Sequence, residues 1–159
     1  MPVTMSRCTL RLMLLVGLVA ASFSAAPVLA QGSKPIQTQD TNAPGVVAEL
    51  VECKREDGVL TVRVLYRNTT DKRVSMKVVP GQNYDEYYMT AGSKKYLMMR
   101  DPQKMTLSPQ AKGGGLTIRL DKGGTYQWWA KYPAPPAEVK KINYYTPLTA
   151  PFDNVPISD

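Results

Sequence analysis

Short stretches in which apolar and polar residues alternate place the strongest constraint on how this chain can fold. In GVLTVRVLYRN (58–68), apolar residues take every second position from Leu60 to Tyr66, and polar residues lie between them except at Leu65. A period of two is that of a strand with one buried face. The same pattern returns in RVSMKVV (73–79) after the turn-forming residues NTTDK. We therefore predict a strand, a turn and a second strand over 59–79.

Turn-forming residues divide the rest of the sequence at short intervals. YDEYYMT and KKYLMMR flank AGS and indicate a hairpin, and LTIRL and TYQWWAKY flank the turn DKGG. Beyond residue 45, apolar residues at helical spacing never persist for three turns. We predict an all-β, antiparallel β-sandwich of about eight strands over 46–159. Prolines in the tail after residue 145 predict an irregular path there.

The beginning of the sequence has the pattern of a secretory signal peptide. Arg7 and Arg11 precede a long apolar run that ends in small residues at Ala30. We expect 1–30 to be removed on export and no stable membrane span to remain. The polar segment 31–45, rich in Gly, Pro and Asn, is predicted to be a flexible leader. The expected location is the periplasm or the medium.

Removal of 1–30 takes away two arginines and lowers the formal net charge from +7 to +5. A basic domain attracts anions. Outside the cytoplasm these are acidic proteins, cell-wall polymers or lipid head groups, so we expect a protein or an anionic envelope component as partner and no nucleic acid. Cys53 is then the one remaining cysteine, which excludes an internal disulfide and indicates a small buried side chain.

The side chains available for catalysis and metal binding are few. The sequence has no histidine, which excludes nucleophiles activated by histidine and removes the commonest zinc and copper ligand. Asp85 and Glu86 are adjacent, so in the expected strand they point to opposite faces and cannot act as a pair. We predict no enzyme activity, no catalytic residue, no metal and no cofactor.

The stretch TYQWWAKY (125–132) separates two adjacent tryptophans onto opposite faces of one strand. Trp128 shares the phase of Tyr126 and Tyr132 and is predicted to lie in the core, whereas Trp129 is predicted to lie outside. If the neighbouring strands belong to one sheet, Trp129 lies among cations. This predicted binding surface comprises Trp129, Arg63, Arg67, Lys77, Arg119 and Lys131.

Two segments resemble parts of known exported proteins. GVLTVRVLYRNTTDKRVSM resembles the early strand pair of immunoglobulin-like domains in exported bacterial proteins, including secreted mycobacterial antigens of that fold. GGTYQWWAKYPAPPAEVKKINYY and PFDNVPI resemble the end of a group of uncharacterised bacterial exported proteins. The resemblance spans 46–157. It implies an immunoglobulin-like sandwich and no catalytic residue.

Three functions are compatible with these features. The first is a non-enzymatic exported module that binds a protein or an envelope component. The second is a carbohydrate-binding or cell-wall-binding module that uses Trp129 and the paired tyrosines of the sequence. The third is a small enzyme or an enzyme inhibitor.

The first testable prediction concerns export. Because the cleavage pattern ends at Ala30, we expect the exported protein to begin at Gln31 and to be released from the membrane. N-terminal sequencing of the protein recovered outside the cytoplasm measures this directly. An exported chain that still begins at Met1 would contradict the signal-peptide interpretation.

Overall fold

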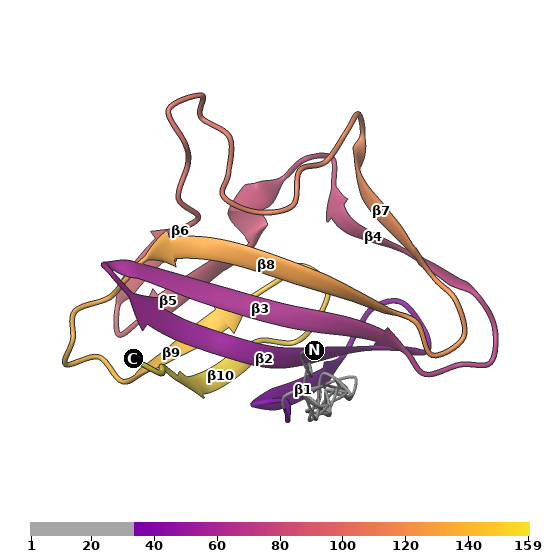
Figure 1. The fold of residues 1–159 in the computed structure, drawn as a ribbon, viewed down its shortest axis with the longest axis horizontal. Coiled ribbons are helices and arrows are strands. Elements are labelled where there is room, and N and C mark those ends of the chain that lie inside the picture. The colour runs from indigo at the N-terminus through magenta and orange to yellow at the C-terminus, as the bar shows by residue number, and fades with distance from the viewer. Residues whose placement is uncertain (1–33) are drawn as a thin grey trace, which may run out of the picture. The chain divides into compact units, whose positions relative to one another are not determined.

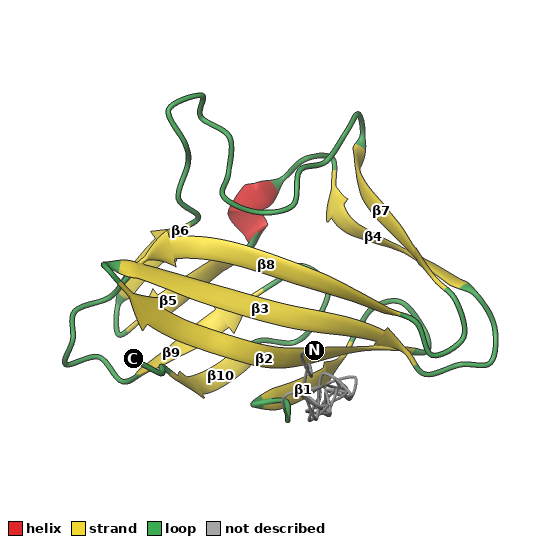
Figure 2. Cartoon of the chain, viewed as in Figure 1, coloured by secondary structure: helices red, strands yellow, loops and turns green. Residues whose placement is uncertain are grey.

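The computed structural model describes residues 34–159, and the expected signal peptide 1–30 lies outside them. Ten strands (Figure 1) and one turn of 3₁₀ helix (Figure 2) form within the described part. They are β1 (Gln37–Asp40), β2 (Val46–Glu56), β3 (Val59–Asn68), β4 (Val74–Pro80), the 3₁₀ turn η1 (Tyr84–Glu86), β5 (Tyr88–Ala91), β6 (Lys94–Leu97), β7 (Gly115–Leu120), β8 (Thr125–Pro133), β9 (Lys141–Tyr145) and β10 (Phe152–Pro156). The all-β prediction is confirmed, with ten strands in place of the expected eight.

The strands form two four-stranded sheets and a two-stranded ribbon, and every pairing between them is antiparallel. The first sheet has the order β1-β2-β3-β8, the second has the order β10-β9-β5-β6, and β4 pairs with β7 in the ribbon. The inner faces of the two larger sheets share one apolar core, so the architecture is that of a β-sandwich. The closer likeness to immunoglobulin-like domains stays a prediction.

Aromatic side chains join the two sheets at the centre of the core. Trp128 on β8 is 0 % exposed, and its indole N–H donates a hydrogen bond to the Tyr144 hydroxyl on β9, 3.2 Å away. The Tyr87 and Trp128 rings lie 4.6 Å apart between centroids, and Tyr132 meets the Tyr144 ring edge-on. A buried indole is favourable only when its single donor finds an acceptor, and Tyr144 supplies one. The predicted inward phase of Trp128 is confirmed.

A bulge in β2 reverses the alternation of that strand. The register shifts between Leu50 and Glu52; Leu50 faces the core before the shift and Cys53 faces it afterwards. The extra residue leaves Glu52 on the outer face, where it pairs in register with Arg63 of β3. Because of this displacement, a carboxylate lies beside the Arg63 cation on the outer face.

The chain leaves the first sheet at Asn68. β3 and β4 are consecutive strands, as predicted, but β3 pairs with β2 and β8 while β4 pairs with β7. Asn68 is 1 % exposed, and its side-chain amide donates hydrogen bonds to the backbone carbonyls of Lys72, Leu120 and Asp121. This one amide therefore ties the β3–β4 connection to the β7–β8 connection and fixes where the ribbon begins.

Two segments that were expected to be irregular are edge strands. Residues 37–40, within the expected leader 31–45, pair with β2, and the tail contains β10, which pairs with β9. The side-chain amides of Gln37 and Gln39 donate to backbone carbonyls in the segment 151–153. The prediction of a flexible leader is therefore wrong for 37–40. Hydrogen bonds to two partner strands hold these polar residues in place. Because such bonds need no apolar side chains, the sequence shows no apolar period that would predict the strand.

Arg55 near the end of β2 binds both the β8–β9 connection and Asp159, the last residue of the sequence. Its guanidinium donates to the backbone carbonyls of Pro135, Pro136 and Val139 in the β8–β9 connection. It also forms a salt bridge with Asp159 at 2.6 Å, and its hydrogen bond keeps the pKa of that carboxyl below the usual value. A guanidinium has five N–H donors, so it can bond to several carbonyls at once. It thereby holds a proline-rich segment that has few N–H groups of its own.

The second testable prediction separates the two tryptophans by stability. Trp128→Ala removes the largest core side chain and should lower the free energy of unfolding by about 3–5 kcal/mol. Trp129→Ala should cost much less, because this residue is half-buried on the outer face. Urea unfolding of both variants measures the difference. Equal losses would show that the outer face carries as much packing energy as the core.

Candidate functional site

Four of the six residues of the predicted binding surface lie on the outer face of the first sheet. Arg63 and Arg67 belong to β3, and Trp129 and Lys131 belong to the neighbouring strand β8. In the register of these strands Arg63 lies directly opposite Trp129, and Thr61 lies opposite Lys131. Directly opposed residues on one face are close enough for their side chains to meet. The condition that the strands belong to one sheet is met for β3 and β8.

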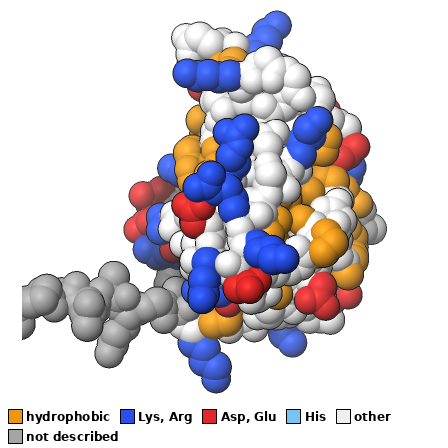
Figure 3. All heavy atoms as spheres, turned by 90° about the vertical axis from the view of Figure 1, so that its right-hand side faces the viewer, with side chains coloured by type: hydrophobic (Ala, Val, Ile, Leu, Met, Phe, Trp, Pro, Cys, Tyr) orange, Lys and Arg blue, Asp and Glu red, His pale blue; other side chains and the backbone are white. Residues whose placement is uncertain are grey.

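The other two residues, Lys77 and Arg119, lie elsewhere. Lys77 is on β4 and Arg119 is on β7, so both belong to the ribbon and not to the sheet that carries Trp129. Figure 3 shows the side of the molecule with the ribbon: Lys and Arg side chains are spread over it, with acidic patches between them. The prediction of one basic surface containing all six residues is therefore wrong. The alternation of apolar and polar residues predicts that each cation faces outward from its strand, but it does not determine which sheet the strand joins.

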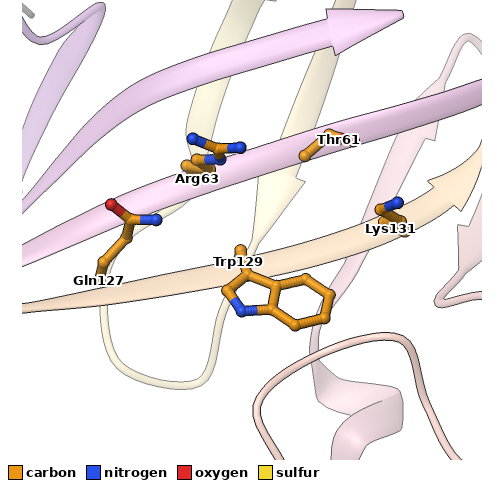
Figure 4. A pocket seen from close by; sticks show the side chains of 5 residues that line it. All are labelled: Thr61, Arg63, Gln127, Trp129 and Lys131. Atoms are coloured by element: carbon orange, nitrogen blue, oxygen red, sulfur yellow. The ribbon is translucent and has the colours of Figure 1, made fainter. Parts of the chain in front are cut away.

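A hollow of about 320 Å³ lies on the outer face of the first sheet, and we call it the Trp129 hollow. Figure 4 shows its side chains rising from β3 and β8, with the indole of Trp129 directed away from β3. The lining residues are Thr61, Arg63, Gln127, Trp129 and Lys131. The hollow therefore combines an aromatic ring, two cations, a hydroxyl and an amide on two adjacent strands.

Two glutamates on β2 neutralise part of the charge of this face. Arg67 donates to both carboxylate oxygens of Glu49, at 3.1 and 2.9 Å, and this hydrogen bonding raises the pKa of Arg67. Arg63 pairs more loosely with Glu52, with 3.5 Å between Nε and Oε1. Lys131 forms no salt bridge with any of residues 34–159. The available positive charge therefore lies at Lys131 and, in part, at Arg63.

Among residues 34–159, no cation–π contact involves the indole of Trp129. Within residues 34–159 the cation–π contacts are those of Lys94 with Tyr96 and of Lys95 with Tyr88, both on the second sheet. Next to Trp129, the edge of β8 is bordered by the segment 99–107, which exchanges backbone hydrogen bonds with Lys131. The ring therefore lies at the border of a closed sheet edge and makes no cation–π contact with any of residues 34–159.

The outward tyrosines lie far from this hollow. In each tyrosine pair one ring is in the core, Tyr87 and Tyr144, and the other, Tyr88 and Tyr145, lies on the outer face of the second sheet. Because the inner faces of the two sheets pack together, the two outer faces point in opposite directions. Trp129 and the outward tyrosines therefore cannot contact one small ligand, contrary to the expectation for a single carbohydrate site.

Among residues 34–159, no three His, Cys, Asp or Glu side chains form a group that could hold a metal ion. Asp85 and Glu86 lie in η1 and not in the expected strand; Asp85 pairs with Arg100, and Glu86 accepts a hydrogen bond from Asn83. In this same range, no helix has the length and apolar character needed to cross a membrane.

The third testable prediction concerns Cys53, the one nucleophilic thiol of the described chain. It is 1 % exposed, and burial raises its pKa to about 12. At pH 8 about one thiol in ten thousand is then ionised, and only the thiolate reacts. A disulfide reagent should therefore label Cys53 only as fast as the protein unfolds. Labelling of the folded protein at the rate of a free thiol would contradict the buried placement.

Comparisons of this chain with protein-family models, with curated proteins and with solved structures found no match. The function must therefore be argued from the geometry and charge of the surface itself.

Proposed function

We propose that this protein is a non-catalytic module, exported from the cytoplasm, that binds an acidic protein partner through the Trp129 hollow. The observation that carries the proposal is the half-buried indole of Trp129, free of a covering cation within residues 34–159, with Arg63 and Lys131 beside it. Tryptophan and arginine supply much of the binding energy at protein interfaces, because they bury a large area and fix polar contacts.

The charges around the hollow favour an acidic partner. Lys131 has no carboxylate partner among residues 34–159, and the 3.5 Å contact between Arg63 and Glu52 is long and exposed. A carboxylate of the partner can pair with Lys131 and compete with Glu52 for Arg63 without breaking a buried ion pair. Arg67 contributes less, because its two hydrogen bonds to Glu49 already satisfy it.

A neutral carbohydrate is a second candidate for the same hollow. It is favoured by Thr61 and Gln127, whose hydroxyl and amide groups can bond to sugar hydroxyls beside the indole. The two candidates differ in their response to salt. Binding of an acidic partner weakens as salt rises, because exposed charges are screened beyond about 8–10 Å near physiological ionic strength. Stacking of a neutral sugar on the indole does not weaken as salt rises, because it involves no charge on the sugar.

The fourth testable prediction uses poly-L-glutamate as the acidic probe. We expect it to change the fluorescence of Trp129 and to bind more weakly as salt rises. Arg63→Glu/Lys131→Glu should slow association by about tenfold or more, because steering charges act mainly on the association rate. Each substitution should change stability by no more than about half a kcal/mol. Stopped-flow fluorescence across a salt series gives these rates.

The matched control is Lys77→Glu/Arg119→Glu, which makes the same change in net charge on the ribbon. It should leave association close to that of the unmodified protein. Equal slowing in the two double variants would mean that only net charge matters, and the hollow would not be the site. A second control, Trp129→Phe, should abolish the fluorescence change, since Trp128 is buried in the core.

A further inference from the structure

The outer face of the second sheet carries a row of side chains that the proposed function does not use. Tyr88 on β5 lies opposite Leu97 of β6 on one side and opposite Tyr145 of β9 on the other. The Tyr88 and Tyr145 rings are stacked, with 4.6 Å between centroids and 11° between planes. Leu97 is 46 % exposed. An aromatic stack with an exposed apolar neighbour therefore runs across three strands.

Lys95 of β6 fixes one end of this stack. Its ammonium lies 3.7 Å from the centroid of the Tyr88 ring. Because the Tyr145 ring already occupies one face of Tyr88, Lys95 covers the other face. No second ring or cation among residues 34–159 covers the far side of Tyr145. Tyr145, which is half-buried, is therefore the ring of the stack with one side free of aromatic and cationic neighbours among these residues.

A polar hollow of about 190 Å³ lies next to the stack on the same sheet. Thr90 and Asn143, two residues along their strands from Tyr88 and Tyr145, are opposed in register and line it together with Lys141 and Asn154. The side-chain oxygen of Asn143 accepts a hydrogen bond from the backbone N–H of Asn154 at 2.8 Å. This bond orients the Asn143 amide and leaves its N–H₂ group to donate to a ligand.

Lysines outnumber acidic residues on the second sheet, whose edge strand β10 contains the exposed Asp153. β5, β6 and β9 contain Lys94, Lys95 and Lys141 and no Asp or Glu. None of these lysines forms a salt bridge with another of residues 34–159. Lys94 has the inward phase of the buried Tyr96, whose ring it covers, so Lys95 and Lys141 are the outward lysines. A ligand of the second sheet should therefore be anionic, and should carry groups that suit hydroxyl and amide partners.

We propose that this face, which we call the Tyr145 face, binds an acidic polysaccharide. Lys141, Asn143 and Tyr145 follow one another at every second position of β9, about 7 Å apart, so one strand presents a cation, an amide and an aromatic ring in line. Lys141 pairs with the carboxylate of a sugar unit, Asn143 and Thr90 bond to its hydroxyls, and Tyr145 packs against the apolar face of the next ring. An acidic peptide supplies carboxylates and backbone polar groups, but it has no sugar ring to pack against Tyr145.

The inference does not depend on the proposed function, because the two surfaces are on opposite sides of the sandwich. Both can be occupied at once, which would let the protein link an acidic protein to an anionic polysaccharide. The tests of the two surfaces are also separate: each has its own probe, and the variants of one serve as controls for the other.

The fifth testable prediction uses the full chain and polygalacturonate, with calorimetry to measure affinity. Dextran provides sugar rings without charge, and poly-L-glutamate provides carboxylates without sugar rings. We expect polygalacturonate to bind to the Tyr145 face and dextran to bind far more weakly. Lys141→Gln should weaken polygalacturonate binding about tenfold, the usual effect of losing a hydrogen bond to a charged group. Tyr145→Leu should weaken it several-fold while keeping apolar bulk in the stack.

The control for this experiment is Arg63→Glu/Lys131→Glu on the first sheet, which should weaken poly-L-glutamate binding and leave polygalacturonate binding nearly unchanged. Lys141 is exposed, so Lys141→Gln should fold normally even if Tyr145→Leu does not. Three results would each overturn the proposal. The first is a polygalacturonate affinity that Lys141→Gln leaves unchanged. The second is an equal loss of affinity for polygalacturonate and poly-L-glutamate in Lys141→Gln, and the third is full displacement of polygalacturonate by phosphatidylglycerol vesicles. The last two would indicate a site for charge alone or for lipid head groups.

Discussion

The hydrogen bond between the Trp128 indole and the Tyr144 hydroxyl is the contact on which the two surfaces of this protein depend. It joins β8 of the first sheet to β9 of the second at the centre of the core, where both side chains are 0 % exposed. Because side chains alternate along a strand, burying Trp128 forces Trp129 outward, and burying Tyr144 forces Tyr145 outward. One buried pair therefore orients a half-buried, outward-facing aromatic residue on each side of the sandwich.

The two outer faces differ because their acidic residues differ. On the first sheet the bulge in β2 displaces Glu52 to a position beside Arg63, and Glu49 accepts both hydrogen bonds from Arg67. Much of the positive charge is thereby paired, and the indole of Trp129 becomes the main feature of the surface. On the second sheet, β6 and β9 carry lysines and no acid, and Asp153 on the edge strand β10 is the one acidic residue of its four strands. The first face suits a partner that buries an aromatic side chain, and the second suits a polar, anionic ligand.

Hydrogen bonds to the backbone close the sandwich where apolar packing is thin. The side chains of Gln37 and Gln39 connect β1 to carbonyls of the segment 151–153 across the gap between the sheets. Asn68 joins the turns on either side of the ribbon, and Arg55 fastens the proline-rich β8–β9 connection. Asn68 and Arg55 each satisfy several backbone carbonyls at once, and Gln37 and Gln39 satisfy one each, which stabilises segments at the edges of the sandwich.

The alternation of β3 and β8 was readable from the sequence because it is a local property: period two with one apolar phase specifies a strand and the face that it buries. This was sufficient to predict the all-β class, the buried Trp128 and the outward Trp129, Arg63 and Lys131. The partner of each strand is a non-local choice, made by burial in the assembled core. Only the tertiary structure therefore placed Lys77 and Arg119 on a separate ribbon, displaced Glu52 by a bulge and turned residues 37–40 into an edge strand.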